Sequence, residues 1–305
     1  MATRKTKPVL SAGNGELSGR LADFERAFGR AVRERAGGPG RLGQALRYAA
    51  LSPGKRLRPL LVLASCEAVG GDWRRALPAA IAVECVHAFS LVHDDLPAMD
   101  DDDYRRGRLT THKKFGEALG ILAGDALLAF AFEELSRLRE AGVPDARVIA
   151  AVRRLASASG ANELVGGQAL DIAAEGRRAT ARVVSDIHVR KTGALMGACL
   201  AIGALAGDAD TRTADRLNEA GIQLGFAFQI TDDLLNAGST LATLGKRAGT
   251  DAARGKATYP VAVGEKRARA EAARRMRAVR GSITRVCESP GLLLQLIEAT
   301  ARRER

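Results

Sequence analysis

Apolar residues recur every three or four positions along almost the whole chain. Two of the clearer stretches contain Ile81, Cys85, Ala88 and Val92 and, further on, Leu122, Ala126, Ala129 and Phe132. This spacing lines up apolar side chains on one face of an α-helix, where they can pack against a core. Runs of alternating β-branched residues never exceed a few positions. The pattern therefore predicts an all-α fold.

Clusters of glycine and proline interrupt this pattern and mark the expected helix ends. They lie at 37–40, 52–54, 70–72, 142–144, 176, 207–208, 238–255 and 289–291. About ten helices are expected between them, and no linker is long enough to divide two domains. We therefore expect a single-domain helical bundle over residues 16–305, built around a deep central cavity, behind a flexible N-terminal segment at residues 1–15.

The net charge of the chain bears on which partners it could bind. The 305 residues carry a formal net charge of +12, with aromatic residues at only 4%. Nucleic acid, an acidic membrane surface and polyanionic small substrates are all compatible with such a charge. Stacking on nucleic-acid bases is not favoured, because few aromatic rings accompany the basic groups. We interpret most of the basic residues as solvated helix faces and expect no nucleic-acid partner.

Cysteine usage and hydropathy bear on the compartment. Cys66, Cys85, Cys199 and Cys287 are scattered, without a CxxC pair or a histidine at metal-ligand spacing. They are interpreted as small apolar fillers, and neither disulfides nor zinc are expected. No stretch approaches about 18 consecutive apolar residues, and no hydrophobic run follows the basic N-terminus. A cytoplasmic protein without stable membrane insertion is expected.

Two acid-rich segments, 93–103 and 229–236, lie far apart in a chain whose overall charge is positive. Each follows an apolar run with helical spacing. Hard divalent cations such as Mg²⁺ bind carboxylate oxygens and share their remaining positions with substrate phosphates. Two such segments facing each other would form a metal and diphosphate site. For either segment alone, the alternative is a solvated acidic helix end.

The first segment carries a line of polar side chains. His87, Ser90 and Asp94 are three and four residues apart, so they share a helix face. Pro97 cannot continue a helix, because it lacks an N–H and clashes with the preceding turn. We expect a bend there that brings Asp100 back toward Asp94.

The second segment places Gln229, Asp232 and Asn236 on one side of a helix. Cations close to glycines accompany both segments and could hold diphosphate groups. They are Lys55 and Arg58, Arg105 and Arg106, Lys191 with the hydroxyl of Thr192, and Lys246 and Lys256. Any one of these alone is better explained as a solvated turn.

With these motifs, the chain resembles the trans-polyprenyl diphosphate synthases, most closely the bacterial short-chain farnesyl and geranylgeranyl diphosphate synthases. The resemblance runs from about Gly15 to Ala301 and rests on motifs in order. They are GKRLRP at 54–59, HAFSLVHDDLPAMDDDDYRRG at 87–107, FGEALGILAGDALL at 115–128, GGQALDI at 166–172, KTGAL at 191–195, FQITDD at 228–233 and LGKRAGTDAARGKATYP at 244–260.

The resemblance implies a homodimeric, Mg²⁺-dependent prenyltransferase. Such an enzyme condenses isopentenyl diphosphate 1′-4 with an allylic diphosphate, dimethylallyl or geranyl, held through three Mg²⁺. The metal residues it implies are Asp94, Asp95, Asp100, Asp232 and Asp233, with Asp251 in support. The catalytic residues it implies are Asp94, Asp95, Asp100, Arg105, Lys191, Asp232 and Lys246.

The resemblance also divides the cations between the two substrates. The allylic diphosphate is expected on Arg105, Lys191, Gln229, Lys246 and Lys256, with Thr192 beside them. Isopentenyl diphosphate is expected on Lys55, Arg58, His87 and Arg106. A side-chain nucleophile is not needed, which fits the lack of any Ser-His-Asp or Cys-His arrangement.

One position departs from the family pattern. Asn236 stands where most relatives have the last aspartate of a DDxxD motif, which removes one negative charge. We interpret this as tolerated variation, with an effect on turnover rate left open.

Two alternatives to a prenyltransferase fit the motifs less well. A terpene cyclase would lack the Lys55, Arg58 and His87 set, and a weakly active regulatory subunit would show more eroded motifs.

Product length is expected to depend on Phe89 and Ser90, five and four residues before Asp94. The resemblance makes these residues the floor of the channel that receives the growing apolar tail. Farnesyl diphosphate is the expected main product. Geranylgeranyl diphosphate is the runner-up, because Ser90 leaves room beside the ring. Without the resemblance, Phe89 is equally an ordinary core aromatic.

Overall fold

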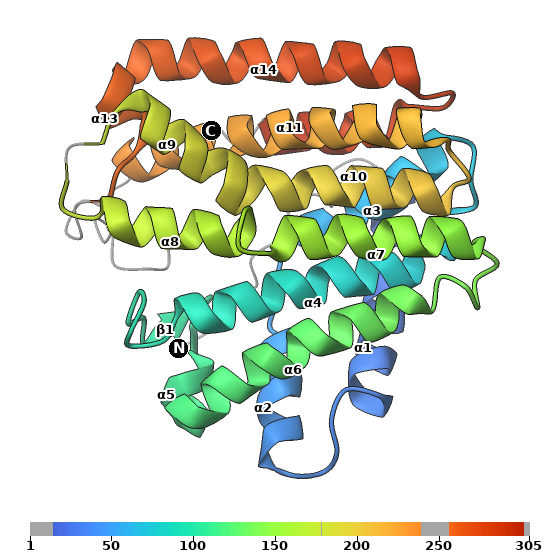
Figure 1. Ribbon diagram of the computed structural model, residues 1–305, viewed down its shortest axis with the longest axis horizontal. Coiled ribbons are helices and arrows are strands. Elements are labelled where there is room, and N and C mark those ends of the chain that lie inside the picture. The colour runs from blue at the N-terminus through green and yellow to red at the C-terminus, as the bar shows by residue number, and fades with distance from the viewer. Residues whose placement is uncertain (1–14, 178, 239–255, 302–305) are drawn as a thin grey trace.

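The computed structural model describes residues 15–177, 179–238 and 256–301, and nearly all of them lie in helices (Figure 1). The helices are α1 (Gly15–Glu34), α2 (Arg41–Ala50), α3 (Leu57–Ala68), α4 (Leu77–Asp94), α5 (Thr111–Phe115), α6 (Glu117–Ser136), α7 (Asp145–Ser159), α8 (Leu164–Ala174), α9 (Ala181–Ile187), α10 (Ala194–Ala206), α11 (Thr211–Gly238), α13 (Tyr259–Val263), α14 (Glu265–Val286) and α15 (Gly291–Ala301). A 3₁₀ turn, η1 (Trp73–Ala76), precedes α4, and a π-helical turn, η2 (His188–Gly193), joins α9 to α10. The predicted all-α fold is confirmed.

The glycine and proline breaks fall between helices as predicted, but the expected number of helices was too low. Short helices account for part of the difference, since α5 and α13 have 5 residues each and α9 has 7. Gly116, with φ of 95°, separates α5 from α6, and it was not among the predicted breaks. The predicted flexible segment 1–15 lies outside the described residues except for Gly15, as does most of the break at 238–255.

A hairpin with two residues in each strand was not predicted from the sequence. Strand β1 (Tyr104–Arg105) pairs antiparallel with β2 (Arg108–Leu109). The turn between them is made by Arg106 and Gly107, with φ of 53° and 75°. Positive φ at both turn residues matches the twist of a tight hairpin. Strands this short contain no alternation that could reveal them in the sequence.

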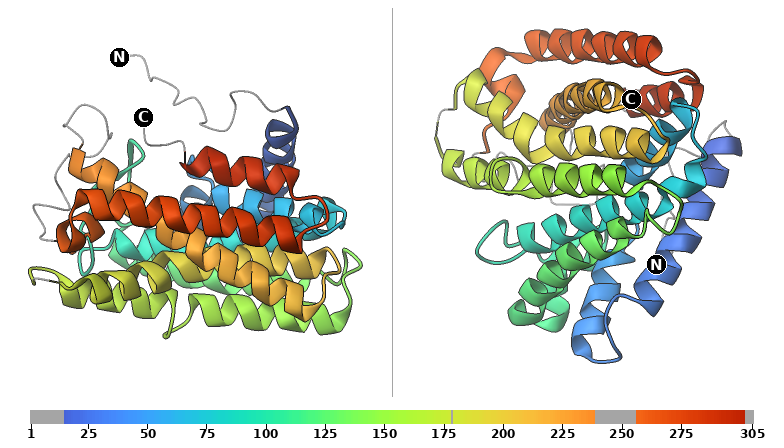
Figure 2. Two further views of the ribbon diagram at one scale, coloured as in Figure 1. Left: turned by 90° about the horizontal axis from the view of Figure 1, so that it is seen from above. Right: turned by 45° about the vertical axis from the view of Figure 1, so that its right-hand side comes forward.

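Helix α10 lies at the centre of the bundle, and all 13 of its residues are buried. It packs against α3, α7 and α11, while α14 covers the outer side of α11 (Figures 1 and 2). A Cβ on Gly225 of α11 would lie 2.6 Å from the Gly193 Cα of η2, and one on Gly221 would lie 2.6 Å from the Gly197 Cα of α10. These backbones approach more closely than any side chain would allow.

Two segments are long and apolar enough to cross a membrane, residues 73–94 and 181–206. Their most apolar windows are 67% and 83% buried within the protein. Both contribute to the core of the bundle, which explains their hydropathy.

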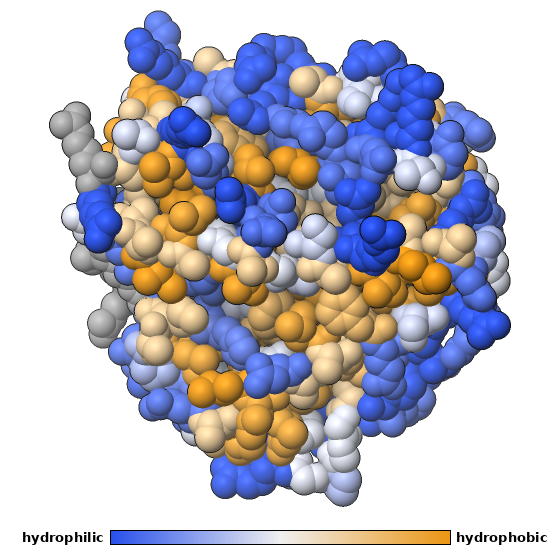
Figure 3. Space-filling model, viewed as in Figure 1, coloured by the Kyte–Doolittle hydropathy of each residue, from blue (hydrophilic) through white to orange (hydrophobic). Residues whose placement is uncertain are grey.

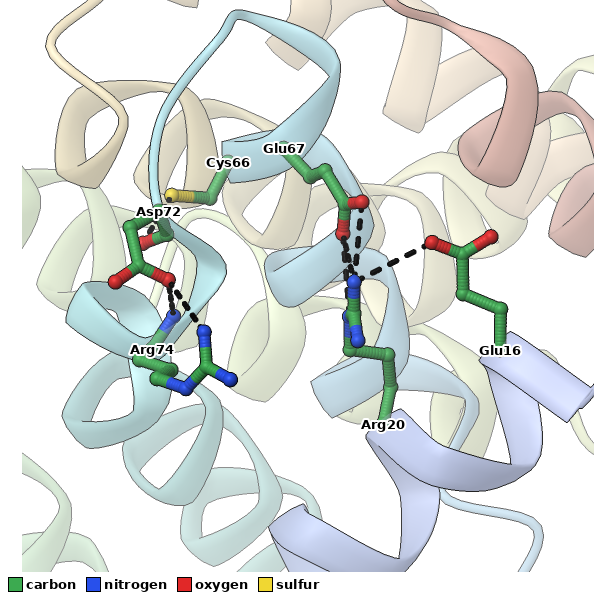
Figure 4. A network of polar contacts seen from close by, with 6 residues as sticks. All are labelled: Glu16, Arg20, Cys66, Glu67, Asp72 and Arg74. Carbon is green, nitrogen blue, oxygen red and sulfur yellow. Dashed lines mark hydrogen bonds and ion pairs between the residues drawn. The ribbon is translucent and has the colours of Figure 1, made fainter.

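Helix α1 is tied to α3 by a network of polar contacts (Figure 4). Arg20 donates to both carboxylate oxygens of Glu67 at 3.1 Å and also contacts Glu16. The Arg20 guanidinium lies 4.6 Å from the centre of the Trp73 ring. Partly buried pairs of this kind fix the position of a terminal helix.

Candidate active site

The C-terminal ends of α4 and α11 point toward the same end of the molecule, where β1, β2 and α13 also lie (Figure 1). Helix α4 ends at Asp94, with Asp95 as its C-cap. The chain then turns back, and the Asp100 N–H donates to the Asp94 carbonyl at 2.8 Å. The bend predicted from Pro97 is therefore confirmed, and it brings Asp100 next to Asp94.

The first acidic motif is surrounded by cations. Burial raises the pKa of the Asp94 carboxyl above its usual range, while the charges of Lys191, Arg105 and Lys256 act against that rise and the charge of Asp100 adds to it. Asp94 thus lies within electrostatic reach of residues from η2, from the hairpin and from the segment just before α13. Residues far apart in sequence converge here as expected.

Arg105 reaches Asp95 from the hairpin. Its Nε donates to Asp95 Oδ1 at 2.7 Å, and its Nη2 lies 2.6 Å from the same oxygen. Asp95 is only 4% exposed. This buried ion pair fixes the hairpin against the end of α4, so Asp95 in this arrangement orients Arg105.

A second cationic group lies about two turns before Asp94 along α4, beside His87. Arg58, in the first turn of α3, has its Nη1 at 3.4 Å from His87 Nε2, and its Nε is buried without a hydrogen-bond partner among the described residues. Burial and the charges of Arg58, Arg106, Arg105 and Arg56 lower the pKa of His87 well below its usual value. His87 is therefore neutral at pH 7, and Arg58 retains a free donor for an anion.

Arg106 joins this group from the hairpin turn, where its Nη1 donates to the Pro53 carbonyl. A Cβ on Gly54 would lie 2.6 Å from that guanidinium, so a side chain there would displace Arg106 from its present position. Lys55 follows directly and is exposed. A cavity of about 40 Å³ lies beside these residues and is lined by His87, Arg106 and Asp95 among others.

Arg56 has a different role from its neighbours in the GKRLRP motif. It is 5% exposed and pairs with Glu84 at 2.6 Å and with Glu25 at 2.8 Å. Its φ of 49° is unusual for a non-glycine residue. Arg56 is thus committed to the core, and sequence reasoning missed this because Glu25 and Glu84 lie in other helices.

The opposite side of the site is built by η2 and α11. Lys191 Nζ lies 2.7 Å from Asp171 Oδ2 on α8, and the Thr192 hydroxyl donates to Gln229 Oε1 at 3.1 Å. Gln229 in turn donates to Asp233 Oδ1 at 3.2 Å. Asp171 was not assigned a role from the sequence, although it lies inside the GGQALDI motif. Its pairing with Lys191 depends on contact between helices.

Lys256, just before α13, forms an ion pair with Asp100 of the first acidic motif, with its Nζ 3.1 Å from Asp100 Oδ1. Asp232 is half-buried on α11 and acts electrostatically on Arg58. Asn236, the departure from DDxxD, is exposed near the end of α11. Lys246 and Asp251, both predicted to act at this site, lie outside the described residues.

The donor set fits Mg²⁺ held jointly with a substrate. Within residues 15–177, 179–238 and 256–301, no three His, Cys, Asp or Glu side chains form a ready-made group around one ion. Mg²⁺ is commonly held by one or two carboxylates and completes its shell with water and substrate phosphates. Asp94, Asp100 and Asp232 supply such carboxylates. The metal and substrate roles of individual residues stay predictions.

Comparison with known proteins decides the family. Residues 39–288 match the family model described as polyprenyl synthetase. The chain belongs to the polyprenyl synthetase family. The farnesyl diphosphate synthase of Escherichia coli (strain K12) is 47% identical over 246 residues, which cover 80% of this chain and 82% of that protein.

Solved structures of similar proteins share the fold. An FPP/GFPP synthase from Zymomonas mobilis, in its apo form, matches with a TM-score of 0.83 at 35% identity, covering 93% of this chain and 99% of that one. A geranyltransferase from Helicobacter pylori, complexed with magnesium and isoprenyl diphosphate, matches with a TM-score of 0.79 at 28% identity, covering 96% and 98%. The family resemblance inferred from the motifs is confirmed.

The two residues predicted to limit product length lie on α4, on the N-terminal side of Asp94. Phe89 is 5% exposed, and its ring contacts the His93 ring edge-on at 5.7 Å. His93 abuts α6, since a Cβ on Gly124 would lie 2.1 Å from His93 Nε2. The Ser90 hydroxyl donates to the His87 carbonyl at 3.0 Å. The deep central cavity and the role of these residues as its floor stay predictions.

Proposed function

We propose that this polyprenyl synthetase is a trans-prenyltransferase that condenses isopentenyl diphosphate 1′-4 with dimethylallyl or geranyl diphosphate, giving mainly farnesyl diphosphate. The observation that carries the proposal is the presence of two separate sets of cations along the C-terminal half of α4. Lys191, Arg105 and Lys256 act on Asp94, and Arg58 and Arg106 act on the neutral His87. Two groups suit two diphosphate substrates.

Different residues of the site bind the two substrates. Arg58 and Arg106 are charged donors that hold isopentenyl diphosphate without a metal, with neutral His87 as a further polar contact. Lys191, Thr192 and Gln229 hold the allylic diphosphate, where Mg²⁺ bound by Asp94, Asp100 and Asp232 would stabilise charge on the leaving group. Three Mg²⁺ are expected at the site.

Bond changes follow from this placement. The bond between C1 and oxygen of the allylic diphosphate breaks, and its electron pair leaves with the diphosphate. The alkene of isopentenyl diphosphate then bonds to C1, and the proton lost from the adduct goes to the released diphosphate. Lys191 and Lys256 stabilise the growing negative charge, which is the largest contribution expected in a reaction of this kind.

Incubation with Mg²⁺, isopentenyl diphosphate and each allylic primer tests the proposal. The dephosphorylated alcohols, separated by chromatography, should be mainly farnesol, with geranylgeraniol as a minor product. No condensation with any primer would contradict the proposed activity. Condensation that ends mainly at twenty carbons would keep the activity and favour the geranylgeranyl alternative.

We further propose a cytoplasmic homodimer. Ile121 and Leu122 of α6 and Ile149 of α7 are exposed by 46%, 49% and 59%. The face on which α6 and α7 lie shows several apolar patches (Figure 3). Covering such residues is a common reason for association. Light scattering of the purified protein should give twice the mass of one chain.

A further inference from the structure

A closed circuit of polar side chains joins η2 to α11 beside the allylic half of the site. The Thr192 hydroxyl donates to Gln229, Gln229 donates to Asp233 Oδ1, and Asp233 Oδ2 lies 3.3 Å from His188 Nε2. His188 and Thr192 are four residues apart on η2, as are Gln229 and Asp233 on α11. The two pairs therefore face each other across the contact between the two segments.

His188 occupies a dry and crowded position. It is 4% exposed, and its ring lies 5.6 Å from the Phe226 ring and 6.1 Å from the Tyr259 ring. Its Nδ1 has no hydrogen-bond partner among the described residues. A buried N–H left unpaired costs more than a bare acceptor beside apolar rings. We therefore assign the proton to Nε2, so that the N–H faces Asp233 Oδ2 at 3.3 Å.

Both carboxylate oxygens of Asp233 are engaged by the protein. Oδ1 accepts from Gln229, Oδ2 accepts from the Tyr259 backbone N–H at 2.9 Å, and His188 Nε2 lies 3.3 Å from Oδ2. Asp233 is 6% exposed. In this environment the carboxylate acts as an anchor, because it accepts from two protein donors and faces a third, the His188 N–H assigned above.

The anchor has consequences for residues that would hold the allylic diphosphate. Tyr259 begins α13, three residues after Lys256, whose ammonium reaches Asp100. Gln229 is fixed by its bonds to Asp233 and Thr192. A change at His188 would therefore be transmitted through Asp233 to Gln229 on one side and to Lys256 on the other.

The local backbone makes this circuit possible. The close approach of Gly193 and Gly225 lets η2 and α11 come within hydrogen-bond reach of each other's side chains. The π-helical turn widens the helix at His188–Gly193, and such turns are often found at functional sites. The circuit is thus held by backbone contact as well as by its own bonds.

We propose that His188 is a positioning residue for the allylic diphosphate: by donating to Asp233 it holds Gln229 in place and anchors the start of α13, close to Lys256. This inference rests on the proposed prenyltransferase activity. It assigns His188 no direct contact with substrate or metal.

A matched pair of substitutions tests the proposal. In His188→Gln the side-chain amide nitrogen can take the place of Nε2 and donate to Asp233, whereas in His188→Asn it takes the place of Nδ1 and falls short. His188→Asn should raise the KM for the allylic primer about tenfold, the effect of one lost hydrogen bond to a charged group. Its KM for isopentenyl diphosphate should change less than twofold, and His188→Gln should restore the allylic KM.

A binding measurement separates this inference from the proposed activity. Calorimetric titration with inorganic diphosphate in the presence of Mg²⁺ should show weaker binding to His188→Asn than to the wild type or His188→Gln. His112→Asn, which removes another buried imidazole, is the control and should bind as the wild type does. Inactive wild-type protein that still shows this binding difference would refute the activity and keep the inference.

Three results would overturn the proposal. They are an unchanged allylic KM in His188→Asn, an equal rise in KM for both substrates, and equal behaviour of His188→Gln and His188→Asn. Loss of the helical circular dichroism signal in His188→Asn would also overturn it, because it would show that the imidazole serves the stability of the fold alone.

Discussion

Lys256 Nζ lies 3.1 Å from Asp100 Oδ1, although the two residues are 156 positions apart in the chain. Asp100 is a residue expected to bind Mg²⁺, so the ammonium and the metal compete for the same carboxylate. Lys256→Met should therefore bind Mg²⁺ alone several-fold more tightly than the wild type, since the competing charge is gone. Calorimetric titration with Mg²⁺ measures this change.

The same substitution should have the opposite effect on diphosphate. With Mg²⁺ present, inorganic diphosphate should bind Lys256→Met less tightly, because a cation that faces the phosphates is lost. Lys266→Met, a change at an exposed lysine of α14, serves as the control and should leave both titrations unaltered. Weaker binding of Mg²⁺ alone to Lys256→Met would rule out the competition.

The two acidic helices should be needed equally for turnover. Asp94→Ala and Asp232→Ala should each reduce kcat by several orders of magnitude, because each removes a carboxylate expected to hold the metal. Steady-state assays at saturating Mg²⁺ check this. Activity near that of the wild type in either variant would mean that the site is not two-sided.

The thermal stability of Asp94→Ala is the control that separates lost turnover from lost folding. Burial raises the pKa of Asp94, so the ionised carboxyl is unfavourable in the folded state above that pKa. The unfavourable contribution fades as the pH falls toward the unfolded pKa of about 4. Without Mg²⁺, Asp94→Ala should therefore melt at or above the wild-type temperature at pH 7.5, with a smaller difference at pH 4.5.

Substitution of Arg56 and of Arg58, two arginines of the GKRLRP motif, should have different effects. Arg58→Ala should raise the KM for isopentenyl diphosphate by at least tenfold, since it removes a charged donor, and Lys55→Ala should act in the same direction. Arg56→Ala should instead lower stability by about 3–5 kcal/mol, because it leaves Glu84 buried without its partner. Substrate kinetics and urea denaturation distinguish the two effects. An Arg58→Ala variant with unchanged KM for isopentenyl diphosphate would place that substrate elsewhere.

The contrast between Arg56 and Arg58 shows what the sequence could and could not predict. The bend after Asp94 follows from the covalent structure of Pro97, so local rules were sufficient. The helices follow from apolar spacing in the same way. Arg56, Asp171 and His188 depend on partners in distant helices, and no spacing within one helix reveals such pairs. The hairpin was missed because its strands have two residues each.

Acidic pH should destabilise the protein through His87. Burial and nearby arginines lower the pKa of His87 well below its usual value, so below about pH 6.5 the unfolded chain binds a proton that the folded protein does not. Stability is therefore lost as the pH falls below that point. Thermal melts between pH 7.5 and pH 5.5 should show a larger decrease for the wild type than for His87→Gln. Parallel curves for the two proteins would assign the acid sensitivity to other groups.

Product length should depend on the ring of Phe89. This ring is 5% exposed and stands edge-on to His93, which is pressed against Gly124 of α6. A growing apolar tail that extends along α4 from Asp94 would meet the ring about one turn below the carboxylate. Phe89→Ala should open that space and shift the product from fifteen toward twenty or more carbons, while total condensation stays within a few-fold.

Because Phe89 also belongs to the core, its truncation is expected to cost about 3–5 kcal/mol of stability. Phe24→Ala is the matched control, since Phe24 is a fully buried ring of α1, and it should lose similar stability without changing the product. The dephosphorylated alcohols of both variants, compared at a temperature where both are folded, separate the two effects. If Phe89→Ala gave the wild-type distribution of products, the floor of the channel would have to be formed by other residues. A shift in both variants would attribute longer products to a loosened bundle rather than to the ring.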